Sequence, residues 1–246
     1  MLDDPPVPND PEAISLFLDF DGTLVELADK PDLIEVPADL PALLARVANR
    51  LSGRLAIVSG RSIADVETHL DCAALTVSGS HGLELRFADC AEQRGDPDNG
   101  MDDDVRAEIV RRAEAFPALH VEHKTLGVGL HYRDDPSLKS DVEALADELA
   151  GRHGLTVKKG NHVVELMPRA CDKGRAVDAI MAKGSFAGTR PVFIGDDLTD
   201  EDGIVAASRH GGYGVIVGDR MPTDARYRLD GPSDVHRWLE NLVEGE

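Results

Sequence analysis

Two aspartates stand directly after the first apolar run of the chain. The residues from Ile14 to Leu18 in ISLFLDFDGTLVEL are typical of a buried strand, and Asp19 and Asp21 follow it. On an extended backbone these two carboxylates project to one side, while Phe20 faces the other. Close carboxylates repel each other unless a cation joins them, and a hard divalent ion with oxygen ligands does so. The spacing therefore predicts a metal site at the end of this strand.

Polar groups also end two later apolar runs. Ser59 follows LAIV, and Asp196 with Asp197 follows VFIG. In a parallel sheet, ligands gather beyond the carboxyl ends of the strands, so we expect these side chains to converge. Mg²⁺ is the expected metal, because it uses only a few carboxylates and commonly binds phosphate as well. The candidate metal ligands are Asp19, Asp21, Asp196 and Asp197.

These residue types predict hydrolysis of a phosphate ester. Asp19 is the candidate nucleophile, forming an aspartyl-phosphate, and Asp21 is the acid that protonates the leaving oxygen and then activates water. Ser59 is expected to donate its hydroxyl to a phosphoryl oxygen, and Lys173 to shield nucleophile and phosphate from each other. Gly22 lets the backbone turn tightly. Alone, each feature also fits a solvated turn or an exposed lysine, but the joint set in this chain order is hard to obtain by accident.

Composition limits the classes of partner. The 246 residues include 46 acidic and 26 basic ones, a net charge of −20 that repels nucleic acid and anionic membrane surfaces. No apolar run reaches the roughly 18 residues that a membrane span needs. The start MLDDPPVPND lacks the regions of a signal peptide, and three widely spaced cysteines without a CxxC fit reduced thiols. We therefore expect a cytoplasmic protein, and the acidic surface favours a monomer.

The order of expected elements predicts an α/β fold with an insertion. Strands and helices alternate in residues 1–83 and again in 168–246, which favours one α/β core with a parallel sheet. Residues 84–167 instead read as a helix followed by two strands, used twice, which predicts an inserted α+β domain. Three helix starts are predicted from their capping residues. The expected caps are Ser62, Thr199 and Ser233.

At these residues the sequence resembles the haloacid dehalogenase superfamily of aspartate-nucleophile phosphatases. The resemblance rests on DFDGT with Asp19 and Asp21, SGR with Ser59, DKG with Lys173, and GDDLTD with Asp196, Asp197 and Asp200. It implies a Rossmann-like parallel-sheet core, dependence on Mg²⁺ and an inserted cap with the duplicated αββ pattern. On the phosphate side it implies contacts from the motif residues Gly22, Thr23, Gly60 and Arg61.

A narrower resemblance covers nearly the full length. SGSHGLE, VEHKTLGVGLHYR, KKGNHVVELMP, GDDLTDED and ARYRLDGPSDVHRWL are similar to the family of trehalose-6-phosphate phosphatases. This implies hydrolysis of trehalose 6-phosphate to trehalose and phosphate, a step of trehalose biosynthesis, with sugar hydroxyls bound by Glu122, Lys124 and Glu165. After the fourth motif the family usually has alanine and an aromatic residue, whereas this chain has Gly203 and Ile204.

Other interpretations stay open at this point. The core motifs fit phosphatases of other sugar phosphates equally well, such as sucrose 6-phosphate, mannosylglycerate or hexose phosphates. Glu122 and Lys124 also fit an exposed sheet face whose charges serve solubility. A sugar-phosphate-binding regulator without turnover is a further class, which the intact acids and lysine oppose. We expect His81 and His131 to pack or form hydrogen bonds rather than bind metal.

Overall fold

A computed structural model of the protein describes residues 2–28, 33–88, 94–95, 101–124, 127–160, 162–168 and 172–245. The chain divides into two compact units. The core unit consists of Met1–Arg94 and Asp172–Glu246, and the inserted unit consists of Gly95–Cys171. Cys90, Cys171 and most of the predicted loop 91–100 lie outside the described residues.

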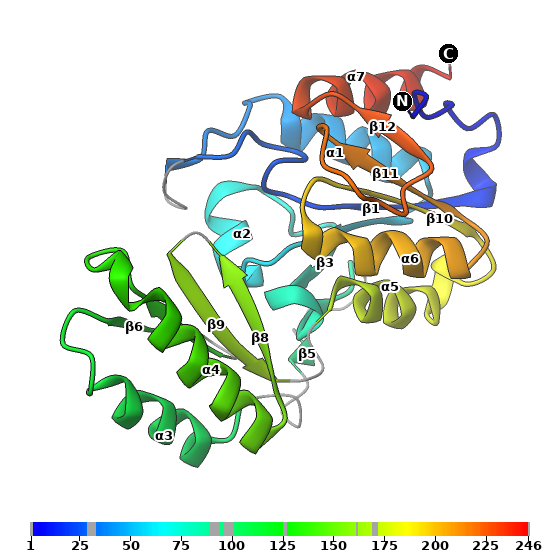
Figure 1. Ribbon diagram of the computed structural model, residues 1–246. Helices are drawn as coiled ribbons and strands as arrows, with labels where there is room; N and C mark the ends of the chain where they lie inside the picture. Colours follow the sequence, from blue (N-terminus) through cyan, green and yellow to red (C-terminus); the bar gives the residue numbers. More distant parts are fainter. Residues whose placement is uncertain are drawn as a thin grey trace. The chain divides into compact units, whose positions relative to one another are not determined.

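The core unit is built on one sheet of eight strands in the order β12-β11-β10-β1-β2-β3-β4-β5 (Figure 1). Neighbouring strands from β12 to β3 run parallel, and β4 is antiparallel to β3. This confirms the predicted α/β core. The strands are β1 (Ile14–Leu18), β2 (Leu55–Val58), β3 (Thr76–Gly79), β4 (Glu84–Arg86), β5 (Arg94–Gly95), β10 (Arg190–Gly195), β11 (Tyr213–Val217) and β12 (Tyr227–Leu229).

Helices cover both faces of this sheet, so its central strands are apolar on both sides. Every residue of β1 is buried; Ile14, Leu16 and Leu18 pack with one hydrophobic cluster, and Phe17 packs with the other. The first cluster includes residues of α1 (Leu40–Arg50), α2 (Ile63–His69) and α7 (Pro232–Glu244). The second includes residues of α5 (Lys173–Met181) and α6 (Glu201–Arg209), which lie together in Figure 1.

The predicted helix caps have different outcomes. Ser62 caps α2, since its hydroxyl accepts from the backbone N–H of Asp65 at 3.1 Å. Thr199 was wrong as the cap before α6: it lies inside the 3₁₀ turn η7 (Leu198–Asp200), which Asp197 and Asp200 close as a capping box. Aspartate caps this turn in place of threonine because its carboxylate accepts hydrogen bonds from backbone N–H groups more strongly than a hydroxyl does.

Ser233 was also wrong as a cap. Helix α7 begins one residue earlier, at Pro232, after Gly231, and has no side-chain cap. Proline suits the first helical position because its fixed φ matches the helix and the N–H that it lacks would have had no partner there.

The inserted unit has its own sheet and its own core. Its strands β6 (His120–His123), β7 (Val128–His131), β9 (Val163–Pro168) and β8 (Leu155–Gly160) are antiparallel, in that order. The helices α3 (Asp103–Ala113) and α4 (Lys139–His153) supply most of the apolar side chains packed on one face. The chain order is helix, strand, strand, used twice, which confirms the predicted α+β insertion. Within the described residues, no helix is both long and apolar enough to cross a bilayer.

Gly203 and Ile204, at which the resemblance predicts a departure from the usual family residues, are buried in α6. A Cβ on Gly203 would lie 2.4 Å from the ring of Phe193, so the glycine lets α6 pack directly on β10. Gly151, in α4, is exposed and has nothing within 4 Å of such a Cβ. The two helical glycines are therefore a matched pair with opposite surroundings.

We expect Gly203→Ala to lower the free energy of unfolding by about 1–3 kcal/mol through overpacking, although alanine is the better helix former. Gly151→Ala should raise it by up to about 1 kcal/mol, because only the helix propensity changes. Urea denaturation of the two variants measures both values. A Gly203→Ala protein as stable as the wild type would contradict the packing argument.

Candidate active site

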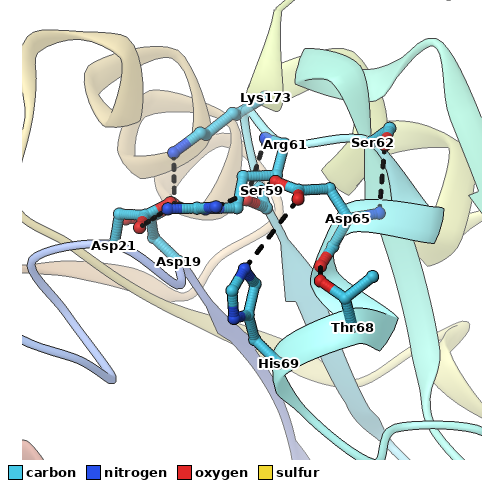
Figure 2. A network of polar contacts seen from close by, with 9 residues as sticks. All are labelled: Asp19, Asp21, Ser59, Arg61, Ser62, Asp65, Thr68, His69 and Lys173. Carbon is cyan, nitrogen blue, oxygen red and sulfur yellow. Dashed lines mark hydrogen bonds and ion pairs between the residues drawn. The ribbon is translucent and has the colours of Figure 1, made fainter. Parts of the chain in front are cut away.

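A buried lysine joins two aspartates at the end of the core sheet. Lys173 Nζ donates to Asp19 Oδ1 and to Asp200 Oδ1, each at 2.6 Å. All three residues are buried, with exposed fractions of 3% for Lys173, 4% for Asp19 and 0% for Asp200. Alternation along β1 places Asp19 on the same face as Phe17, toward α5, and Lys173 is the first residue of α5. Figure 2 shows the side chain of Lys173 reaching Asp19.

A third aspartate completes a cluster of acids. Asp19, Asp196 and Asp200 each place one carboxylate oxygen within 4.8 Å of the others, so this group could hold a metal ion. The second oxygen of Asp200 accepts from the backbone N–H groups of Asp196 and Asp197, at 3.2 and 3.0 Å. Both carboxylate oxygens of Asp200 therefore accept hydrogen bonds.

The residues present fit a cation. Asp196 Oδ1 is buried and has no hydrogen-bond partner among the described residues. Gly22, with φ of +80°, leaves the space for this carboxylate, since a Cβ there would lie 2.2 Å from Asp196 Oδ2. Buried acceptor oxygens almost always have a partner, so a divalent cation with oxygen ligands suits this place.

The pKa shifts of the clustered groups also favour a bound cation. Burial, with the carboxylate of Asp200, raises the pKa of Asp19 well above its usual value and that of Asp196 to about 6. Burial opposes the charge on Lys173, but Asp19 and Asp200 outweigh it and raise the lysine pKa. A cation beside the acids would reverse the shifts of Asp19 and Asp196, because it favours their ionised forms.

Asp21 has a different partner. The guanidinium of Arg61 donates to both its oxygens, from Nε at 2.7 Å and from Nη2 at 2.8 Å, while Nη1 binds Asp65 at 2.8 Å (Figure 2). Such a fork-shaped pair orients both groups. Asp21 thus lies outside the three-acid cluster in the described structure and beside a cation of the β2–α2 loop.

The predicted phosphate-side residues lie on the loops after β1 and β2. Ser59 is fully buried and its Oγ accepts from the N–H of Arg61 at 3.1 Å, which leaves the hydroxyl hydrogen free to donate. Thr23 Oγ1 is buried with no hydrogen-bond partner among the described residues. Gly60 is exposed, and a Cβ there would lie 2.7 Å from the ring of His81.

The structure therefore brings together some of the predicted metal ligands and separates others. Asp19 and Asp196 share the cluster, whereas Asp21 pairs with Arg61 and Asp197 is exposed outside it. The cluster member absent from the predicted set is Asp200. Its signal in the sequence is the three-residue spacing from Asp197, which is that of a capping box.

The predicted sugar-binding residues lie on one face of the inserted sheet. Lys124 Nζ pairs with Glu165 and lies 3.9 Å from Glu122 Oε2, and His131 Nε2 contacts the same Glu122 oxygen at 2.8 Å. Gly129 is the register partner of both Glu122 and Glu165, so no side chain stands between the two acids. A Cβ there would lie 3.1 Å from Glu122 Oε2.

Comparison with known proteins agrees with the fold and with the family that the sequence resembles. A family model described as trehalose-phosphatase matches residues 17–233. The trehalose-6-phosphate phosphatase of Escherichia coli (strain K12) is 33% identical over 228 residues, which are 92% of this chain and 85% of that protein. Two solved structures under 25% identical share the fold.

The first is the C-terminal domain of C. albicans trehalose-6-phosphate phosphatase, with a TM-score of 0.77 at 23% identity over 95% of this chain and 92% of that one. The second is a haloacid dehalogenase-like hydrolase from Bacteroides thetaiotaomicron, with a TM-score of 0.68 at 17% identity over 93% of this chain and 98% of that one. The chain has the fold of these hydrolases and belongs to the trehalose-phosphatase family.

Proposed function

We propose that the protein hydrolyses trehalose 6-phosphate to trehalose and inorganic phosphate through an aspartyl-phosphate on Asp19. The observation that supports this most directly is the buried contact between Lys173 and Asp19 inside a cluster of acids. Lys173 occupies one oxygen of Asp19 and so leaves Oδ2 to attack. The substrate is inferred from the family and from the relative in E. coli.

The reaction needs two proton transfers, and Asp21 is the residue proposed to make them. In the first step the bond between Asp19 Oδ and phosphorus forms, the ester P–O bond breaks, and Asp21 gives its proton to the sugar oxygen. In the second, Asp21 takes a proton from water, the water oxygen bonds to phosphorus, and the bond to Asp19 breaks. In the described structure Arg61 orients Asp21 through both of its oxygens, and one of these two bonds has to open for Asp21 to carry the proton of the first step.

Mg²⁺ is the proposed cofactor. Asp19 and Asp196 would hold it, with Asp21 and Asp197 as the further predicted ligands, and Asp200 would brace the site through Lys173 and the backbone. When bound, the ion supplies positive charge that polarises the phosphoryl oxygens. The phosphoryl group itself would be bound by the loops after β1 and β2. The residues proposed for this are Gly22, Thr23, Ser59, Gly60 and Arg61.

The polar face of the inserted unit is proposed to bind the sugar. Glu122 and Glu165 flank Gly129, and Lys124 contacts both acids, so two acceptors and a donor are held around a bare stretch of backbone. Carboxylates accept hydrogen bonds from paired hydroxyls, which is the chemistry of a sugar. We further propose that the protein acts as a monomer in the cytoplasm; the buried free thiol of Cys72 fits a reducing compartment.

Phosphate release from trehalose 6-phosphate, sucrose 6-phosphate, glucose 6-phosphate and an aryl phosphate, with Mg²⁺ or with EDTA, tests the proposal. We expect a metal-dependent preference for trehalose 6-phosphate, and a loss of roughly 10⁴-fold or more in Asp19→Asn because its amide is not a nucleophile. Equal rates on all substrates would contradict the substrate assignment. No release from any of them would favour a regulator without turnover.

Substitutions on the proposed sugar-binding face should lower activity on the sugar substrate alone. Glu122→Ala and Glu165→Ala should each lower kcat/KM for trehalose 6-phosphate by about 10- to 100-fold, the cost of losing a hydrogen bond to a charged group. Turnover of the aryl phosphate should stay near the wild-type rate, since it has no sugar to bind. Glu114→Ala, which changes an exposed acid at the end of α3, is the matched control. Equal losses on both substrates would contradict a role in sugar recognition.

The raised pKa of Asp196 predicts how Mg²⁺ affects stability. A carboxyl whose folded pKa lies above its unfolded value, here about 6 against 3.8, favours the fold at low pH, and that contribution is lost as pH rises through about 6. A cation compensates for the ionised form, so Mg²⁺ should raise Tm more at pH 7.5 than at pH 5. Asp196→Asn should abolish most of this increase. An increase of equal size at both pH values, measured by scanning calorimetry, would contradict the assignment.

A further inference from the structure

Glu84, the first residue of β4, is a buried acid that the proposed reaction does not use. Its exposed fraction is 4%, and both its oxygens accept hydrogen bonds. Oε2 accepts from the backbone N–H of Ile63 at 2.6 Å, and Oε1 accepts from the hydroxyl of Ser80 at 3.1 Å. A buried carboxylate is costly unless it is hydrogen-bonded in this way, so the two donors are what keep it in place.

Both donors adjoin the loop that contains Ser59, Gly60 and Arg61. Ile63 is the first residue of α2, directly after this loop, and Ser80 begins the 3₁₀ turn η3 (Ser80–Gly82). Glu84 therefore ties the start of α2 to the turn η3.

The turn η3 contacts all three residues of the loop 59–61. Ser80 N donates to the carbonyl of Arg61 at 2.7 Å, and His81 N donates to the carbonyl of Ser59 at 3.0 Å. The ring of His81 lies against Gly60, where a Cβ would come within 2.7 Å of it. The position of the loop backbone is thus set by η3.

The backbone of η3 is unusual in a way that needs support. Ser80 and His81 have φ values of 49° and 54°, in the left-handed region that favours glycine. Side chains adopt this conformation only where the surrounding structure holds it, and such residues cluster at functional sites. The bond from Ser80 Oγ to Glu84 anchors the first of the two residues.

We propose that Glu84 is a positioning residue for the phosphate-side loop, acting on Ser59 and Arg61 through Ile63 and η3. It sets where the Ser59 hydroxyl and the Arg61 guanidinium lie, and through Arg61 it sets the position of Asp21. The inference rests on the proposed function, because it assigns these groups to the phosphoryl site.

Two substitutions separate the contacts from the charge. Glu84→Gln keeps both contacts, since its amide oxygen can accept from Ile63 N and its NH₂ can donate to Ser80 Oγ. Glu84→Ala removes both. Because a displacement of about 1 Å in a reacting group can lower a rate about 100-fold, we expect Glu84→Ala to lower kcat by about that factor on trehalose 6-phosphate and on an aryl phosphate. Glu84→Gln should stay close to the wild type.

A double-mutant cycle with Arg61→Ala tests whether the effect passes through the loop. If it does, Glu84→Ala should lower kcat much less in the Arg61→Ala protein than in the wild type, because coupled residues are not additive. Arg54→Met is the structural control: Arg54 is also buried, but it binds the carbonyls of Ile14 and Pro11 at the amino end of β2. It should lower Tm and leave kcat unchanged.

Three results would overturn the inference. They are a Glu84→Ala protein with reduced Tm and normal kcat, a Glu84→Gln protein as slow as Glu84→Ala, and additive losses in the cycle. The aryl phosphate separates this test from the substrate assignment. A wild-type protein that turns over the aryl phosphate but not trehalose 6-phosphate would contradict the proposed substrate, and the cycle would still decide the role of Glu84.

Discussion

The structure depends on one buried contact, in which Lys173 Nζ bridges the carboxylates of Asp19 and Asp200. A buried charge is tolerated only when it is paired, so this bridge requires β1, the start of α5 and the turn before α6 to meet at one point. Asp19 and Lys173 are 154 residues apart in the sequence, and the whole inserted unit lies between them. With Asp196 added, three acids face one lysine. The cluster therefore favours a cation, which is the condition for the proposed phosphoryl chemistry.

Steric conditions at two glycines make this concentration of acids possible. A Cβ on Gly22 would lie 2.2 Å from Asp196 Oδ2, and one on Gly195 would lie 2.3 Å from Asp200 Cγ. The carboxylates occupy the space that ordinary side chains would take beside the strand ends. The site therefore needs residues without a side chain at these two positions as much as it needs the acids. A side chain at either glycine would collide with a carboxylate of the cluster.

The second polar group of the core unit is the pair of Arg61 and Asp21, and a different part of the backbone supports it. Arg61 stands on a loop held by the turn η3, and that turn is held by Glu84. The proposed nucleophile, Asp19, is held by a lysine at a helix start, whereas the proposed acid, Asp21, is held by a guanidinium on a loop. The inserted unit has a third polar group, around Gly129, built on its own sheet. Each proposed task of the enzyme therefore rests on a separate element of backbone structure.

The sequence by itself determined the type of fold and the class of reaction. Apolar runs that end in Asp19, Ser59 and Asp196 predict parallel strands with polar ends, because buried strands and their ligand edge have a local signature. The partners of these groups depended on the tertiary structure. That Asp21 binds Arg61, that Asp200 joins the cluster, and that Glu84 binds the first residue of α2 follow from contacts between segments distant in sequence, where a hydrogen bond of 2.6 to 2.7 Å depends on how the elements pack. Residue type and spacing show which groups can react, and packing alone decides which of them meet.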